Sequence, residues 1–467
     1  MGDERPGRSG LTLRGTAGPS TLGEVLRHRS LRLVGLSWGS STTAEGAYLV
    51  VLGVFAYEEG GAVAVGLVGL IRMVPASAAA SFGSLLADRF ARERILRAVE
   101  AMRAALLAGA AFAAFAGAPA ALVFMVAAVH ALVSGVFRPS FKSLLPSLAR
   151  TPAQLVAANA AASTLEGFGT LVGPALGGVL IATAGASVGF AAASACCLVS
   201  FGLLMALRVE GGALRAAAPG RSLGDVLAGF RTVASSNNPR LIVVLFAAQT
   251  FVRGALSVLI VVVALDLLAL GQSWVGFLMA AIGAGGVVGA LAATGLAGRP
   301  MAVPLLLGLV LWGAPIATIG AFPSAAVALL ACMAIGAGNA IINVAGNTLL
   351  QRVVPNEVLG RVFGAFVGLT LVAVGLGSIV TPAVIDALGT RGALVVIGAL
   401  LPLVALIAGA RVRAIDRDAA PPERELGFVR GVPMLAALSV ACAEQIASRL
   451  SLVPIAAGRA IISEGER

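Results

Sequence analysis

The sequence is poor in charge. Only 12% of its 467 residues are Asp, Glu, Lys or Arg, whereas 58% are hydrophobic. A soluble domain carries about 25% charged residues, so this composition excludes an ordinary soluble protein and predicts an integral membrane protein. Lysine is almost absent, since Lys142 is the only one, and the net charge of +11 therefore comes almost entirely from arginine.

The residues that build metal centres and nucleophilic active sites are also scarce. The chain has 4 cysteines and 2 histidines, and the cysteines form no C-x-x-C pair. No Ser/His/Asp set, phosphate-binding loop or metal-ligand cluster stands in the sequence. We therefore predict that the protein is not an enzyme and that it uses no cofactor and no metal. The polar N-terminus, up to Ser20, lacks the short apolar region of a signal peptide.

Long apolar runs, separated by arginine-bearing loops, make up most of the chain. At ~20 apolar residues per span, the runs between Leu31 and Ala410 predict about twelve membrane spans. The arginines gather in alternate loops, which indicates loop charge that sets membrane orientation, and no nucleic-acid partner. Because positive charge stays in the cytoplasm, we expect a multi-pass protein of the plasma membrane with both termini cytoplasmic.

The most informative stretch is EGFGTLVGPALGG, inside a long apolar segment. Gly169, Gly173 and Gly177 fall four apart on one helix face, where they let a neighbouring membrane helix approach closely. Pro174 bends the helix, and Gly178 completes the pattern G-x-x-x-G-P-x-x-G-G. This pattern resembles the fifth-helix antiporter motif of the major facilitator superfamily. Ordinary close packing of helices is the alternative interpretation.

The loop after the second span, GSLLADRFARER, resembles a cytoplasmic loop motif of the same superfamily. Asp88, Arg89 and Arg92 stand at positions of the motif, whereas Ser84 and Ala91 replace its glycines. The resemblance implies a cytoplasmic gate that clamps two helix bundles together, with Asp88 facing the positive end of a helix dipole. The alternative is that these charges only set the topology.

The resemblance covers about residues 25–414 and implies an all-α membrane fold of twelve transmembrane helices in two pseudo-symmetric six-helix bundles, the major facilitator fold. A substrate site is then expected near the bilayer midplane, between the bundles. The predicted parts are an N-terminal tail (1–28), the first bundle (29–208), a cytoplasmic linker (209–240), the second bundle (241–414) and a cytoplasmic tail (415–467).

Ionisable side chains inside the spans are expensive to bury and usually functional. Glu45 and Glu166 are the candidates for proton coupling, because a carboxyl group in a membrane cavity can exchange its proton when the cavity changes side. Arg72, Arg138 and Arg253 are candidate charge partners. Permanent structural ion pairs with Arg72 or Arg138 are the alternative role of the two carboxylates.

Three asparagines recur at every fourth position of a later span. Asn339, Asn343 and Asn347 share one helix face. They are candidates for the wall of a polar cavity, or for hydrogen bonds that hold this helix to a neighbour. His130, in the fourth span, is expected to be a hydrogen-bonded structural residue.

The C-terminal tail carries a second resemblance. An amphipathic helix over residues 431–450 and two short apolar strands between Val453 and Glu466 are expected. This order resembles the opening of a cyclic-nucleotide-binding domain, which some facilitator-type transporters carry at their C-terminus. The phosphate-binding cassette of such a domain is not in the sequence, so the tail is expected to hold no nucleotide on its own.

These motifs together predict a secondary active transporter that works by alternating access. The expected activity is proton-coupled export of a small amphipathic solute. The fifth-helix motif favours efflux, and the sequence resembles the exporter branch that includes siderophore and macrolide efflux proteins. The expected partners are a small-molecule substrate, protons and the lipid bilayer. The alternative is a membrane-bound sensor, whose transporter-like bundle signals to its cytoplasmic tail.

Overall fold

The computed structural model describes residues 29–89, 92–148, 152–207, 237–296, 299–354 and 356–419, with residue 231 and a few short pieces between 427 and 450. These residues are helical almost throughout, as expected for an all-α protein. The elements are α2 (Arg29–Arg89), α3 (Arg92–Phe115), α4 (Ala120–Leu148), α5 (Pro152–Met205), α7 (Asn237–Val262), the π-helical η1 (Val263–Leu267), α8 (Gln272–Ala293), the 3-10 helix η2 (Thr294–Leu296), α9 (Ala302–Ala321), α10 (Ala325–Val353) and α11 (Asn356–Ala419).

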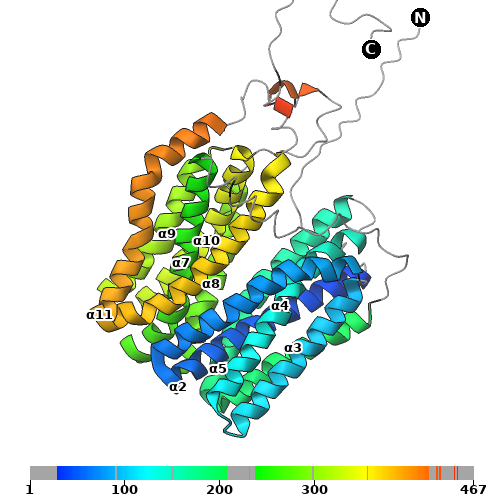
Figure 1. Ribbon diagram of the computed structural model, residues 1–467, viewed down its shortest axis with the longest axis vertical. Coiled ribbons are helices and arrows are strands. Elements are labelled where there is room, and N and C mark those ends of the chain that lie inside the picture. The colour runs from blue at the N-terminus through cyan, green and yellow to red at the C-terminus, as the bar shows by residue number, and fades with distance from the viewer. Residues whose placement is uncertain are drawn as a thin grey trace, which may run out of the picture.

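Nine helices in the described part of the chain are long and apolar enough to cross a membrane, and three of them are far longer than a bilayer requires. A crossing needs about 20 residues, whereas the apolar parts of α2, α5 and α11 run over 45, 48 and 51 residues. Each is interrupted by a glycine with positive φ: Gly61 (60°), Gly185 (82°) and Gly389 (69°). Glycine enters this left-handed region at little cost, so each long element is two helices joined at a kink. Figure 1 shows α11 turning back on itself in this way.

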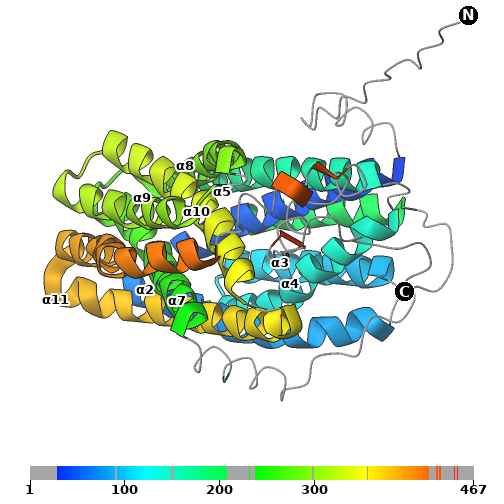
Figure 2. The ribbon, with the colours of Figure 1, turned by 90° about the horizontal axis from the view of Figure 1, so that it is seen from above.

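The helices form two halves with corresponding contacts. In the first half, α2 and α3 each pack on both α4 and α5. In the second half, α11 packs on α7 and α9, and α10 packs on α8 and α9. The half from blue to teal and the half from green to orange lie side by side in both views (Figures 1 and 2).

The two halves meet close to the glycine kinks. At the contact of α5 with α8, a Cβ added at Gly178 would lie 2.7 Å from the carbonyl oxygen of Ser273. At the contact of α2 with α11, a Cβ added at Gly66 would lie 2.5 Å from the carbonyl oxygen of Ser378. At the opposite end, the helices of the two halves diverge (Figure 1). The molecule is therefore closed at the end of the kinks by backbone contacts that only small residues permit.

Charged side chains brace the second half at its other end. Asp416 Oδ2 accepts a hydrogen bond of 2.8 Å from the backbone N–H of Ala302, the first residue of α9. This carboxylate therefore caps a helix N-terminus, where a negative charge is stabilised by the helix dipole. Arg352 Nη1 lies 4.0 Å from the other oxygen of Asp416. The ion pair joins α10 and α11, and the cap joins α11 and α9.

Asp416 belongs to the segment 415–467 that the sequence assigned to the tail. The structure continues α11 through it to Ala419, past the predicted bundle boundary at 414. The remaining tail, with the expected start of a cyclic-nucleotide-binding domain, lies almost entirely outside the described residues. The N-terminal tail (1–28) and nearly all of the linker (209–240) before α7 lie outside them as well.

Candidate functional site

The glycine motif of α5 lies directly against the first arm of α2. A Cβ added at Gly173 would lie 2.5 Å from the carbonyl oxygen of Thr43, and one at Gly177 would lie 2.5 Å from that of Ala47. Gly169 faces the hydroxyl group of Thr42 in the same way. The stripe thus permits backbone-to-backbone approach of two helices, which is how membrane helices pack without a hydrophobic driving force.

The rest of the motif packs on two further surfaces. Pro174 contacts the first arm of α2, where a Cβ added at Gly46 would lie 2.7 Å from its Cδ. Gly178 instead faces the second half of the molecule, where an added Cβ would lie 2.8 Å from the Cα of Gly276 in α8. α5 is consequently in close contact with its own half on one side and with the other half on the other side.

We predict that Gly173→Leu abolishes transport, because its side chain would meet the backbone oxygen of Thr43, which cannot rotate away. Gly202→Leu is the matched control, since a Cβ at this position of the same element meets nothing within 4 Å. The measurement is solute flux in reconstituted vesicles at equal protein content. Wild-type flux from the Gly173→Leu protein would contradict the role of the close approach.

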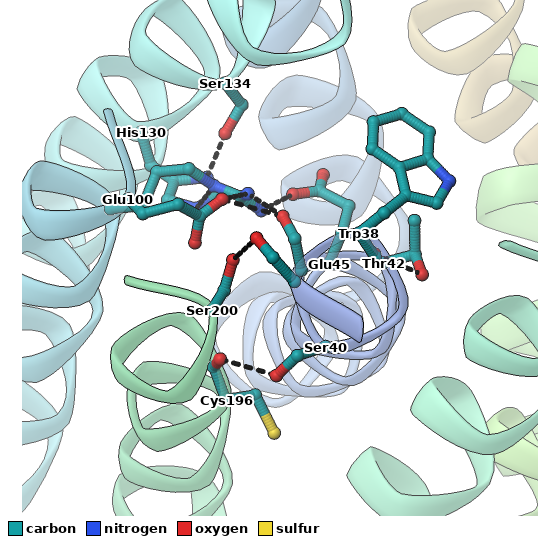
Figure 3. Close-up of polar contacts among 12 residues, drawn as sticks. Trp38, Ser40, Thr42, Glu45, Glu100, His130, Ser134, Cys196 and Ser200 are labelled. Atoms are coloured by element: carbon teal, nitrogen blue, oxygen red, sulfur yellow. Dashed lines mark hydrogen bonds and ion pairs between the residues drawn. The ribbon is translucent and has the colours of Figure 1, made fainter. Parts of the chain in front are cut away.

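A network of buried charges connects α2, α3 and α4. Glu45 is bound by two arginines: Arg72 Nη2 lies 3.1 Å from its Oε1, and Arg103 Nη2 lies 2.9 Å from its Oε2. Figure 3 shows Glu45, Glu100 and His130 converging from the three helices. The side chain of Arg103 is 3% exposed and that of Glu45 is 31% exposed, so the network extends from the interior of the first half toward solvent-accessible space.

Arg103 is the centre of this network. Its Nη1 donates to Glu100 Oε1 at 2.9 Å and to the hydroxyl oxygen of Ser41 at 2.6 Å. Ser41 in turn donates to the same oxygen of Glu100. His130, fully buried, accepts at 3.5 Å from Arg103 Nε through its Nε2. The network therefore has no net charge, because the two carboxylates of Glu45 and Glu100 are balanced by the guanidinium groups of Arg72 and Arg103.

Glu100 and Arg103 were missed in reading the sequence. The signal was present, because both stand within the apolar run of the third span, three residues apart on one helix face. The pairing of Arg103 with Glu45 could not be predicted, since it depends on the distance between α2 and α3. His130 has the hydrogen-bonded, buried position that was expected, and its ring packs on Tyr48 with the centroids 4.4 Å apart.

A second ion pair joins α4 and α5. Arg138 Nη1 donates to Glu166 Oε1 at 2.9 Å, and the guanidinium group also lies over the ring of Trp38, 5.5 Å from its centroid. The arginine of this pair is more accessible than those of the first network: the side chain of Arg138 is 58% exposed, against 13% for Arg72 and 3% for Arg103. Glu166, at 32%, is about as exposed as Glu45. Next to Glu166, a Cβ added at Gly167 would lie 3.2 Å from Val287 of α8, so the pair lies beside the second half.

Arg253 on α7 belongs to the opposite half. Its side chain is exposed, and it makes no ion pair within the described part of the chain. Arg138 of the first half, which carries the same charge, is near enough to act on it electrostatically. An exposed charge inside a span must reach water, and α7 contacts α2 of the first half, so Arg253 belongs to the water-accessible space beside the first half. The sequence named it as a partner of the carboxylates, and this role stays untested.

The three asparagines of α10 do not act alike. Asn339 Oδ1 accepts from Gln249 Nε2 of α7 and from Trp312 Nε1 of α9, both at 3.3 Å. This side chain ties three helices of the second half together. Asn343 and Asn347 donate their amides to the carbonyl oxygen one turn earlier in their own helix. Asn343 is exposed. For these two residues the place in a polar cavity wall stays a prediction.

The candidate cytoplasmic gate falls at a helix boundary. Asp88 and Arg89 are the last residues of α2, and Arg92 is the first residue of α3. The side chains of Asp88 and Arg89, and residues 90–91 between the helices, lie outside the described part. The role of these three residues as a gate stays a prediction.

Two helical halves, joined through small residues at one end, with accessible charges between them at membrane depth, define a membrane transporter of the two-bundle type. Comparison with known proteins gives the family. The sequence profile of the Major Facilitator Superfamily matches residues 34–370 and 304–457. The chain belongs to the Major Facilitator Superfamily, so it is a transporter and not an enzyme.

Two of the curated relatives are named as efflux proteins. The chain is 26% identical over 356 residues to the multidrug efflux pump Tap of Mycobacterium tuberculosis, covering 74% of this chain and 84% of that protein. It is 30% identical over 342 residues to the enterobactin exporter EntS of Escherichia coli, covering 69% of this chain and 78% of that protein. With the apolar helices, these likenesses make the chain a multi-pass protein of the plasma membrane.

Solved structures of transporters share the fold. The nucleoside transporter NupG superposes with a TM-score of 0.66 at 13% identity, covering 82% of this chain and 98% of that one. A bacterial homologue of the lysosomal transporter Spinster, in an inward-facing and unoccupied conformation, superposes with a TM-score of 0.60 at 14% identity, covering 86% and 98%. At these identities the likeness shows the fold alone.

Proposed function

We propose that this protein exports a small amphipathic solute in exchange for protons. The observation that carries the proposal is the accessible Arg138–Glu166 ion pair, whose carboxylate lies on α5, the helix that bears the glycine motif. A carboxylate that has to load and release a proton must reach water, and it must lie where the two halves move against each other. Glu166 meets the first condition because its side chain is 32% exposed. It meets the second because its chain neighbour Gly167 packs on α8 of the other half.

Glu45 is the second candidate for proton coupling. To change its charge it must lose two ion pairs, with Arg72 and Arg103, whereas Glu166 must lose one. Its side chain is nevertheless 31% exposed. We assign Glu166 the exchange of protons and Glu45 the alignment of α2 with α3, on the ground of this difference in the number of partners.

The proposed topology has twelve spans in two six-helix bundles. It follows if α2, α5 and α11 each cross twice, turning at Gly61, Gly185 and Gly389, and the other helices cross once. The arginine-rich ends of the helices, among them the start of α3, lie away from these kinks. Since positive charge stays inside, both termini are cytoplasmic, and the divergent end of the molecule faces the cytoplasm.

In alternating access, this inward-facing arrangement takes up solute and then closes on the cytoplasmic side. Asp88 and Arg89 end α2 and Arg92 begins α3, at the end of these helices that the proposed topology puts in the cytoplasm. We assign them the gate that holds the closed form. The direction of transport is supported by the relatives, which are named as an efflux pump and an exporter.

The proposal is tested in vesicles that contain the purified protein, with a pH gradient imposed and a panel of fluorescent amphipathic solutes. We expect flux of at least one solute against its gradient, which collapses when a protonophore is added. Vesicles containing Gly173→Leu protein serve as the inactive control. Solute flux that is identical with and without the pH gradient would overturn proton coupling. A protein that moves none of the panel would favour the sensor alternative.

A further inference from the structure

Arg253 occupies an unusual electrostatic position. It lies at the middle of the membrane span Asn238–Leu267, where a charge is expensive unless it is paired or reaches water. The three other arginines of the site each contact a carboxylate: Arg72 and Arg103 share Glu45, and Arg138 has Glu166. Arg253 has no such contact in the described residues.

The second half offers no carboxylate at this depth within its described helices. Asp266, in η1, is thirteen residues further along, or about 20 Å at ~1.5 Å per residue. Asp416 caps α9 at the other end of the half. Arg138 of the first half, which has the same sign, is near enough to act on Arg253 electrostatically. Arg253 and Arg138 bring two positive charges to this space and Glu166 brings one negative charge, so one positive charge remains uncompensated. Like charges repel, so a bound negative charge is favoured there.

We infer that Arg253 anchors an anionic group of the transported solute, so that the substrate class is amphipathic organic anions such as carboxylates. This inference rests on the proposed transport function and names its substrate. A guanidinium group binds a carboxylate through two parallel hydrogen bonds, and a bound anion would supply the charge that the site lacks. It would also relieve the repulsion between Arg253 and Arg138.

The surroundings suit the apolar part of such a solute. Val287 of α8, which lies beside Gly167, is 42% exposed. The membrane potential also favours a negatively charged solute. An anion leaves a cell down an inside-negative membrane potential, so exchange of a solute anion for an incoming proton is driven by the potential as well as by the pH gradient.

The test compares three naphthalene derivatives of similar size: 1-naphthylacetate, its neutral amide 1-naphthylacetamide, and the cation 2-(1-naphthyl)ethylammonium. Binding to the purified protein is measured by calorimetry, and transport is measured separately in vesicles. We expect the carboxylate to bind at least about tenfold more tightly than the amide or the cation. Arg253→Gln should abolish this preference, Arg253→Lys should keep part of it, and Arg391→Gln, at an exposed position in the turn of α11, should leave it unchanged.

Equal or tighter binding of the ammonium compound would overturn the inference, as would a carboxylate preference that survives in Arg253→Gln protein. The two proposals can fail separately. Transport of the amide or the cation without the carboxylate would refute the anionic substrate and leave proton-coupled export standing. Carboxylate preference in binding, lost in Arg253→Gln, without flux of any solute would support the anion site and refute the transport function.

Discussion

Arg103→Gln is expected to destabilise the protein by about 3–5 kcal/mol, the usual effect of removing one partner from a buried ion pair. Arg103 is 3% exposed and binds both Glu45 and Glu100. Without it, Glu45 retains Arg72, but Glu100 is left fully buried with no cation. Its Oε2 already lacks a hydrogen-bond partner, so the whole desolvation penalty of a carboxylate falls on the folded state. The measurement is thermal unfolding in detergent.

Two further variants separate the network from a general effect of substitution in α3. Arg94→Gln removes an exposed arginine of the same helix and should leave the unfolding temperature nearly unchanged, as is usual for surface changes. The double variant Arg103→Gln with Glu100→Gln removes the stranded charge and should recover much of the stability. An unfolding temperature of Arg103→Gln protein equal to that of wild type would refute the central place of Arg103.

The close packing of α5 could be predicted because it depends on spacing alone. Glycines four apart must share a helix face, and the structure finds Thr43 and Ala47 of α2 against Gly173 and Gly177. The partner helix could not be predicted, since nothing in the spacing distinguishes α2 from other helices. Gly178 illustrates this limit, because it faces α8 of the other half.

The buried polar network could be predicted from the sequence only in part. An acidic residue within an apolar run predicts a charged site, and Glu45 and Glu166 were found in this way. Which arginine each contacts depends on how the helices pack. Arg72 and Arg138 are indeed their neighbours, but the second partner of Glu45 is Arg103. That residue went unrecognised because it stands close to the arginine-rich start of its helix, where loop charge is the first interpretation.

In the second half, too, the sequence predicted which residues share a helix face but not which residues they contact. The four-residue spacing placed Asn339, Asn343 and Asn347 on one face, but only the packing of α7 and α9 shows that Asn339 binds Gln249. Asp416 was assigned to the tail by the charge of its surroundings, RAIDRD. Its capping of α9 requires two segments more than a hundred residues apart in sequence to meet. Composition predicts that a segment is polar, and only tertiary contacts decide whether it is solvated.

Glu166→Gln is expected to abolish proton-driven export while the protein stays folded and keeps solute exchange, because glutamine imitates the protonated carboxyl group permanently. The loss of its ion pair should cost only about 1 kcal/mol or less, since accessible pairs contribute little and the Arg138 side chain is 58% exposed. Transport and stability should therefore separate in this variant. Glu59→Gln, which removes an exposed carboxylate at the kink of α2, is the control and should export normally.

The double variant Glu166→Gln with Arg138→Gln distinguishes a proton carrier from a simple charge partner of Arg138. If Glu166 carries the proton, removal of Arg138 cannot replace the lost carboxyl group, and the double variant should stay uncoupled. If Glu166 only neutralises Arg138, the double variant has balanced charge again and should recover proton-driven flux. The measurements are flux under a pH gradient, solute exchange without one, and thermal unfolding, on both single variants and the double. Recovered proton-driven flux in the double variant would refute the carrier role, because a proton cannot be exchanged at a position that no longer titrates.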